Sequence, residues 1–487
     1  MFSKIFSEKH RSGIFLLLFS AALVVVNIIR IICVPMTIDE SPSEQDLALS
    51  YSDYFHLNKV TANIHILHSM LRKFFIETFA NTPFFLRLDI LLAQVLFLLI
   101  TCRLLSKIFD NKFWVVTTFL AINLNPFLFE FWGLSRGYGL AIAMMMTSIF
   151  FLFSFLESRK KMALLLTLFF AIVSVYANFS LLYFFLSVIS LLTIESLLLT
   201  RHEKEYRKTL EVLFPILLAS IGLYLLIYEP IQKLIDNKEL YYGGNFNVLC
   251  DTIQTLVRTS LLENNKDNLL VLIWYYPIAT LVIGLFLYWL IQLFRKGFSS
   301  DHRKGIVLAW LFTAPLIINT IQHELFGSKL LIDRTALFLY PLFILCFAVS
   351  LFSFSQRKKQ VYSKVLMILF CALLGFSFMK NTNFNRSWQW WENNYNLVFL
   401  QRIAAKEKNR KGKLKLRVNW VFYPSINYYI NRHYKDLFEP MVFTQQDPEK
   451  DTVFDYYYLK RNELQYLNER YKIDTCFADS NFVLLQK

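Results

Sequence analysis

The feature that most constrains this chain is a series of long apolar runs separated by short polar breaks. A helix needs roughly 20 mostly apolar residues to cross the hydrocarbon core of a bilayer, and about eleven runs approach that length. We therefore predict an all-α polytopic membrane bundle. The predicted spans are residues 13–34, 84–101, 113–131, 138–156, 162–175, 179–199, 210–228, 269–294, 305–321, 335–354 and 361–378.

The fifth and sixth of these runs are separated only by Tyr176-Ala177-Asn178. One long kinked segment would also fit this pattern. We count two spans, because residues 162–199 are too many for a single crossing.

Lysine and arginine are distributed unevenly over the connections between the runs. With the N-terminus in the cytosol, every cytosolic connection carries three or four of them, whereas the short connections on the other side carry few. Cytosolic loops hold the excess of Lys and Arg, so this orientation is favoured, and an odd number of spans then exports the C-terminus. The cytosolic residues are Lys4, Lys9, Arg11, Arg103, Lys107, Lys112, Arg159, Lys160, Lys161, Arg201, Lys204, Arg207, Lys208, Arg295, Lys296, Arg303, Lys304, Arg357, Lys358, Lys359 and Lys364.

The first apolar run follows basic residues and could be mistaken for a signal peptide. Its length, about 22 residues, exceeds the usual apolar region of such a peptide. We interpret it as a retained first span, with cleavage near Ser20-Ala22 as the alternative.

The net charge of +15 could suggest a nucleic-acid partner. A basic nucleic-acid-binding domain gathers its Lys and Arg on a soluble face, whereas here they mark the cytosolic loops, so we expect none. The six cysteines form no CxxC pair, which indicates neither a zinc site nor a disulfide framework.

Three segments are too polar to span and fall on the exported side: residues 35–83, 229–268 and everything after about 379. Within the last segment, strand-like alternation over Leu414–Phe422, a helical pattern over Ser425–His433 and a strand-like run over Phe477–Leu485 predict a small α/β domain. We therefore divide the chain into a membrane module, residues 1–378 with the exported loop 35–83, and a soluble exported domain, residues 379–487.

Polar side chains that could carry chemistry gather at the exported ends of the spans. An ion pathway would need charges spaced through the bilayer, so their gathering at one surface favours a reaction there over transport. These residues are Asp39, Glu40, His65, His68, Asp89, Glu130, Arg136, Tyr138, Asn178, His323, Glu324, Asp333 and Arg334.

Four short motifs give the chain a family resemblance. They are the acidic pair Asp39-Glu40 after the first span, the segment Asn63–His68, the segment Ser135–Leu140 that opens the fourth span, and Asp333-Arg334 before a late span. In this order and on this membrane side, they resemble the C-type (GT-C) superfamily of membrane glycosyltransferases. The most similar members are bacterial relatives of protein mannosyltransferases and of the lipid A aminoarabinose transferase. The part of the chain after about residue 350 contributes nothing to the resemblance.

The resemblance implies an inverting transfer of a sugar from a polyprenyl-phosphate carrier to an acceptor glycan, lipid or protein. Asp39 maps onto the catalytic carboxylate, which takes the acceptor's proton as the nucleophile attacks. Arg136 and Arg334 are the lipid-phosphate candidates, since guanidinium groups suit phosphate oxygens. The implied location is the bacterial inner membrane, with the active site facing the periplasm or exterior. Residues expected to orient donor or acceptor are Glu40, Glu130, His65, His68 and Tyr138.

His65 and His68, three residues apart, could also be imagined as metal ligands together with His56. We expect no metal and no other cofactor, because hydrogen bonding to phosphate or sugar fits the family pattern better. The chain departs from that pattern at Asn178, where relatives often have histidine, and at Asp89, where many have proline.

Two other functions compete with this prediction. A lipid-linked glycan polymerase or ligase also works with about a dozen spans, but it concentrates its polar sites in a late loop. A transporter or flippase for a lipid-linked sugar would show intramembrane charges and pseudo-repeats. Neither pattern is visible in this sequence.

Overall fold

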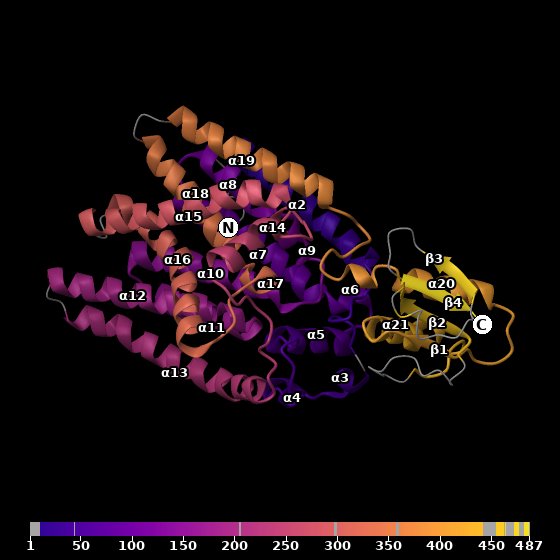
Figure 1. Ribbon diagram of the computed structural model, residues 1–487. Helices are drawn as coiled ribbons and strands as arrows, with labels where there is room; N and C mark the ends of the chain where they lie inside the picture. The colour runs from indigo at the N-terminus through magenta and orange to yellow at the C-terminus, as the bar shows by residue number, and fades with distance from the viewer. Residues whose placement is uncertain are drawn as a thin grey trace. The chain divides into compact units, whose positions relative to one another are not determined.

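The computed structural model describes residues 10–42, 44–203, 206–296, 300–356, 360–441, 454–461, 463, 472–476 and 482–486 (Figure 1). The predicted features that lie outside these ranges are Lys4, Lys9, Lys204, Arg357, Lys358, Lys359 and part of the run 477–485.

The chain divides into two compact units. The first contains residues up to Ile28 together with Tyr51–Thr382, and the second contains Ile29–Ser50 together with the described residues from Asn383 onward. Helix α2 (His10–Cys33) passes from the first unit into the second. The loop that follows the first span therefore belongs to the same unit as the C-terminal part of the chain.

The first unit is helical. A backbone in lipid must satisfy its own polar groups, and an α-helix does so within one segment. Besides the start of α2, it contains α4 (Tyr51–Phe55), α5 (Ile66–Thr78), α6 (Pro83–Leu86), α7 (Leu88–Ile108), α8 (Lys112–Asn123), α9 (Pro126–Glu130), α10 (Gly137–Ser158), α11 (Lys161–Ala177), η1 (Phe179–Leu181), α12 (Leu182–Glu203), α13 (Tyr206–Asp236), η2 (Leu249–Ile253), α14 (Gln254–Ser260), α15 (Leu269–Lys296), α16 (Ser300–Phe326), α17 (Asp333–Ala336), α18 (Leu339–Phe354) and α19 (Gln360–Asn381).

Within the described ranges, 8 helices are long and apolar enough to cross a membrane: α2, α7, α10, α12, α13, α15, α16 and α19. The other predicted spans correspond to the shorter apolar helices α8, α11 and α18. The multi-pass character is thus supported, whereas the number of crossings stays a prediction.

The predicted span 113–131 is wrong in extent, because its helix ends at Asn123. Asn125 then begins a separate short helix: its Oδ1 accepts a hydrogen bond from the backbone N–H of Leu128 at 2.8 Å, and Pro126 follows as the first helical residue. An Asn cap followed by Pro is a strong start signal for a new helix.

The prediction of two helices in residues 162–199 is confirmed. Asn178 has an extended backbone between α11 and η1, and its side chain accepts a hydrogen bond from Ser180 N at 2.9 Å. This cap ends one helix and begins the next.

Helix α10 occupies the centre of the first unit. It packs against α7 and α11, and 78% of its most apolar window is buried, compared with 17% for α13. A helix that is apolar all round and buried is a core helix. Around it, α12 contacts α13 and α16, and α18 contacts α16, α8 and α19, as Figure 1 shows in purple to orange.

The second unit contains a four-stranded sheet. The strand order is β1 (Leu416–Val418), β2 (Tyr456–Lys460), β4 (Phe482–Gln486) and β3 (Lys472–Cys476), with β1 parallel to β2 and the other pairs antiparallel. The helical elements of this unit are α3 (Glu44–Ala48), η4 (Trp391–Asn393), α20 (Asn396–Lys406), α21 (Tyr423–Tyr429) and η5 (Ile430–Tyr434).

The side chains of β2 alternate between the two faces of the sheet. The Tyr458 ring packs on Phe399 of α20 and on Phe422, with ring centroids 3.8 and 4.3 Å apart. Tyr457 forms a separate cluster with Leu459 and Leu485. The C-terminal part of the chain thus contains a small sheet with helices, as the sequence pattern predicted, whereas the domain bounds stay a prediction.

Candidate functional site

The predicted motif at the start of α10 is held by two close backbone approaches. A Cβ atom on Gly137 would lie 2.4 Å from the carbonyl oxygen of Ala177 and 2.6 Å from Cβ of His65. A Cβ atom on Gly139 would lie 2.9 Å from the ring of Trp132. Only glycine permits such approaches, so Gly137 brings the loop with His65 directly against α10, and Gly139 lets the Trp132 ring pack against the same helix.

Arg136 is the residue before this helix and is only 2% exposed. One guanidinium nitrogen, Nη2, donates to Oδ1 of Asn63 at 3.3 Å. Two of the sequence motifs, Asn63–His68 and Ser135–Leu140, are therefore joined in the structure.

His65 lies at the centre of this group. Its ring contacts that of Tyr138 edge to face, with centroids 4.8 Å apart. Its Nε2 is buried and has no hydrogen-bond partner among the described residues. Burial lowers the pKa of His65 well below its usual value, and the charges of Arg136, His68, Arg334 and Arg72 lower it further. A neutral imidazole thus lies in a field of guanidinium groups, an environment suited to an anionic ligand.

His68 is paired with Asp89. Its Nδ1 lies 2.5 Å from Oδ2 of Asp89, and its Nε2 lies 3.2 Å from Oγ of Ser135. Ser135 donates its proton to the carbonyl oxygen of Leu86 at 2.7 Å, so Nε2 of His68 is the donor in the contact with Ser135. This buried chain fixes the residue directly before Arg136.

Arg334 is supported by the segment between α13 and α15. Its guanidinium lies 4.8 Å from the centroid of the Tyr242 ring, in a cation–π contact. The neighbouring Asp333 accepts hydrogen bonds from the Tyr242 hydroxyl, at 3.1 Å, and from Arg258. Asp333 has φ +45°, a strained value for a residue other than glycine. These contacts hold the backbone that carries Arg334.

Glu130 ends α9 and is 3% exposed. Its backbone carbonyl accepts a hydrogen bond from Gly133 N at 3.0 Å, which forms the turn leading to Arg136. Glu130 and Arg136 thus belong to one short buried segment.

Asp39 and Glu40 belong to the second unit. The Glu40 carboxylate is fully buried and accepts a hydrogen bond from Thr37 N at 3.1 Å, and Ser41 Oγ donates to Thr37 O at 2.8 Å. Asp39 lies in this tight turn and is partly exposed. Glu40 therefore shapes the backbone around Asp39.

The described residues contain no group of three or more His, Cys, Asp and Glu side chains that could hold a metal ion. His56 lies at hydrogen-bond distance, 2.8 Å, from Glu229.

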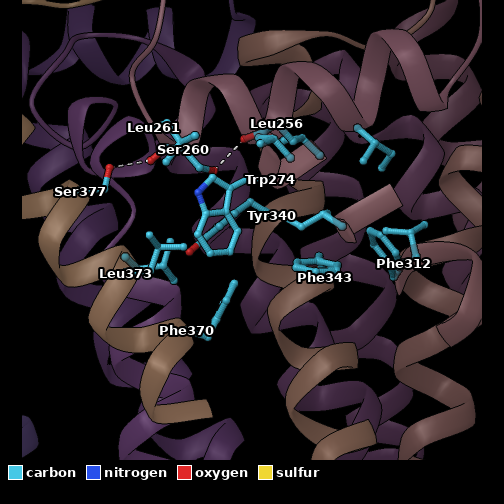
Figure 2. Close-up of a pocket in the computed structure, with 15 residues that line it drawn as sticks. Leu256, Ser260, Leu261, Trp274, Phe312, Tyr340, Phe343, Phe370, Leu373 and Ser377 are labelled. Carbon is cyan, nitrogen blue, oxygen red and sulfur yellow. Dashed lines mark hydrogen bonds between the residues drawn. The ribbon is translucent and has the colours of Figure 1, made fainter. Parts of the chain in front are cut away.

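An apolar pocket opens among α14, α15, α16, α18 and α19 (Figure 2). The Trp274 indole and the Phe370 ring lie on its wall. Its hydroxyl groups are hydrogen-bonded to the backbone: Ser260 Oγ to Leu256 O at 2.7 Å, Ser377 Oγ to Ser260 O at 3.0 Å and Tyr340 Oη to Ala121 O at 2.6 Å. The rest of the lining is hydrocarbon and aromatic rings.

No protein-family model matches the chain, and no curated protein matches it. Among solved structures, the chain is similar to ArnT from Cupriavidus metallidurans bound to undecaprenyl phosphate, with 10% identity, a TM-score of 0.52 and coverage of 98% of both chains. The chain has the fold of ArnT. The apo structure of the same ArnT matches with 9% identity, a TM-score of 0.41 and coverage of 97% of both chains.

The fold shared with ArnT confirms the predicted resemblance to the C-type membrane glycosyltransferases. At 98% coverage the likeness to ArnT includes the C-terminal part of the chain, which carried no motif of the resemblance.

Some contacts in this ArnT-like chain could not be predicted from the sequence. Tyr242 and Arg258 lie in a segment with no recognised motif, and only the folded structure brings them to Asp333 and Arg334. The sequence predicts Asp89 as one of the polar residues at the ends of the spans and as a departure from the family pattern, but not as the partner of His68 that the structure shows. The sequence offers one signal for the role of Asp89, which is its place near the start of a predicted span. A carboxylate buried there needs a partner.

Proposed function

We propose that this chain is an inverting glycosyltransferase that moves a sugar from a polyprenyl-phosphate donor to an acceptor on the exported face of a bacterial inner membrane. The observation that carries the proposal is the fold shared over 98% of the chain with ArnT, whose structure holds undecaprenyl phosphate. The guanidinium groups near His65 support it, because they suit a phosphate.

In the proposed reaction, Arg136 and Arg334 bind the phosphate of the donor. Charge develops on the phosphate oxygen as its bond to the sugar breaks, so fixed guanidinium groups stabilise the transition state more than the ground state. His65 is neutral, and its buried Nε2 is available for a hydrogen bond to phosphate or sugar. Tyr138 packs against the His65 ring and is proposed to help orient the donor or the acceptor.

Asp39 is the proposed general base. The acceptor oxygen or nitrogen forms a bond to the anomeric carbon while the bond from that carbon to the phosphate oxygen breaks. The proton of the acceptor passes to the Asp39 carboxylate, and polyprenyl phosphate leaves with the electron pair. Attack opposite the leaving group inverts the anomeric centre. Glu40 orients Asp39 through its bond to Thr37, and Glu130 and His68 orient the substrates indirectly through the segment before Arg136.

The apolar pocket of Figure 2 supports a lipid donor. Its wall offers hydrocarbon and aromatic rings, and its hydroxyl groups are bonded to the backbone. An isoprenoid segment suits this apolar lining because it is itself apolar and has no hydrogen-bonding groups.

The test is transfer from a radiolabelled polyprenyl-phosphate sugar in proteoliposomes, comparing wild type with Asp39→Asn. The variant keeps the size of the side chain but cannot take the proton, so we expect transfer to fall by about 100-fold or more. Asp53→Asn is the matched control, because Asp53 lies on α4 and accepts a hydrogen bond from Asn58 at 2.7 Å.

Normal transfer by a well-expressed Asp39→Asn variant contradicts the assignment of the base. Movement of the labelled lipid across the membrane with no glycosidic product supports a flippase instead. Growth of a lipid-linked glycan by repeated transfer supports the polymerase alternative.

A further inference from the structure

The turn that contains Asp39 is held by side chains from the other end of the chain. Ile38 N donates to Oδ1 of Asn393 at 2.8 Å, Met36 N donates to the hydroxyl oxygen of Tyr429 at 2.9 Å, and Ser425 Oγ donates to Met36 O at 2.7 Å. Three backbone groups within three residues before Asp39 are thus satisfied by side chains more than 350 positions away.

Two of these side chains come from one face of a single helix. Ser425 and Tyr429 are four residues apart on α21, so they lie one above the other on the helix surface. One accepts from the N–H of Met36 and the other donates to its carbonyl oxygen, so the helix holds both polar groups of this residue. A movement of Met36 relative to α21 would break both hydrogen bonds at once.

Asn393 ties the turn to the same helix by a second route. Its Oδ1 accepts from Ile38 N, and its Nδ2 donates to Val421 O at 3.1 Å, just before α21. Asn393 is 1% exposed, Ser425 0% and Met36 0%. Water therefore cannot replace these bonds, and each buried group that lost its partner would destabilise the turn.

The remaining backbone of the turn is held from within. Glu40 accepts from Thr37 N on the far side of Asp39, and Glu40 N and Ser41 N both donate to Thr37 O, at 3.2 and 3.1 Å. The peptide units on both sides of Asp39 are thus fixed while its own side chain stays partly exposed. Such an arrangement aims a reactive group and leaves it accessible.

We propose that Asn393, Ser425 and Tyr429 are positioning residues for Asp39, so that the C-terminal part of the chain is required for the chemical step. The inference rests on the proposed function, in which Asp39 is the base. It assigns to this part of the chain a role in catalysis itself, separate from any role in binding the acceptor.

The experiment uses full-length protein in proteoliposomes and the variants Asn393→Ala, Ser425→Ala and Tyr429→Phe. We expect kcat to fall by about 10- to 100-fold with the KM for the lipid donor unchanged, because a base displaced by about 1 Å loses rate without loss of binding. Ser425→Thr restores the hydroxyl and is expected to recover most of the rate. The pH at which kcat falls on the acid side, which reports the base, is expected to shift in the impaired variants.

Tyr456→Phe is the matched control. Tyr456 is a buried tyrosine of the same unit, 1% exposed, whose hydroxyl donates to Glu407 at 2.7 Å. It loses a hydrogen bond of the same kind, and we expect its kcat and pH profile to stay those of wild type.

Hydrogen exchange gives a readout that does not depend on activity. The amides of Met36 and Ile38 are expected to exchange faster in Tyr429→Phe and Asn393→Ala, respectively, and unchanged in Tyr456→Phe.

The outcomes separate the two proposals. Wild-type kcat in all three variants, with Asp39→Asn inactive, overturns the positioning role and leaves the proposed function intact. Full activity of Asp39→Asn overturns the base assignment and this inference with it. A loss of kcat that tracks melting temperature and matches that of Tyr456→Phe identifies a purely structural role, which also overturns the inference.

Discussion

Nδ1 of His68 lies 2.5 Å from Oδ2 of Asp89, and the two side chains are 3% and 1% exposed. The pair joins α5 to the first turn of α7 and supports Ser135, the residue before Arg136. Two stretches of the chain that the sequence places about twenty residues apart are thus joined by a pair so deeply buried that water cannot replace either partner.

Asp89→Ala tests this pair. Removal of one partner of a buried pair lowers the free energy of unfolding by about 3–5 kcal/mol, because the remaining side chain stays buried without a partner. We expect this loss in the free energy of unfolding, measured in mixed detergent micelles. The double variant His68→Ala with Asp89→Ala should lose less than the sum of the single variants.

The control is Glu77→Ala, which breaks the pair between Lys73 and Glu77 on α5, at 2.7 Å, in which the Glu77 side chain is 50% exposed. Exposed pairs contribute little, so its unfolding should match that of wild type. Equal unfolding of Asp89→Ala and Glu77→Ala would show that the buried pair does not stabilise the fold.

His65 predicts a dependence of stability on pH. Its folded pKa is lowered well below 6.5 by burial and by Arg136, whereas an unfolded histidine has a pKa near 6.5. Below about pH 6.5 the unfolded state binds a proton that the folded state does not, so stability falls as the pH drops. Above about pH 6.5 His65 is neutral in both states, so its protonation no longer lowers the free energy of unfolding.

Replacement His65→Gln removes this term. Unfolding curves of wild type and variant, recorded from about pH 5 to 8, should diverge in the acid range, by at most about 1.4 kcal/mol per pH unit. Parallel curves throughout would mean that His65 takes up a proton equally in both states.

Arg136→Gln tests the phosphate assignment. Loss of one buried group that stabilises developing charge costs about 100- to 1000-fold in rate, so we expect kcat/KM for the lipid donor to fall to that extent. Arg136→Lys keeps the positive charge but loses the paired N–H donors of the guanidinium group, so its kcat/KM should lie between those of wild type and Arg136→Gln. Arg207, whose side chain is 93% exposed beside Glu211, supplies the control Arg207→Gln. Equal kcat/KM values for Arg136→Gln and Arg207→Gln would remove Arg136 from the site.

Gly137→Ala tests the close approach of α10 to the His65 loop. The added methyl group would meet the Ala177 carbonyl at 2.4 Å, so we expect a loss of about 1–3 kcal/mol in unfolding free energy. Gly284 lies within α15 with nothing within 4 Å of its added Cβ, so Gly284→Ala should be neutral or slightly stabilising. A Gly137→Ala protein as stable as Gly284→Ala would contradict the packing described here.

The apolar runs predicted the helices well because burial in lipid or in a helical core selects the same residues. The prediction failed at residues 113–131, where composition suggested one span and the cap at Asn125 with Pro126 divides it. A run of apolar letters does not distinguish one long helix from two short ones unless the cap residues are weighed.

Three of the residues predicted for the candidate site lie together in the structure. Arg136, His65 and Tyr138 were predicted as site residues from short motifs, and the structure brings them together, with Gly137 permitting the contact. The bonds from Asn393, Ser425 and Tyr429 to the turn before Asp39 leave no periodic or compositional signal, because they depend on tertiary pairing between distant residues. The sequence pattern accordingly predicts residues 35–83 as part of the membrane module, whereas contacts group Ile29–Ser50 with the C-terminal part.

The bonds between the turn at Met36–Ile38 and residues 393–429 also set a time order for synthesis. A growing chain makes its apolar helices first and its C-terminal residues last, so the turn before Asp39 waits through most of translation for its partners. Contacts of such long sequence separation form late. A chain released before residue 393 would contain the apolar helices described in the first unit and still lack the bonds that shape this turn, so the turn acquires these bonds only after those helices have been made.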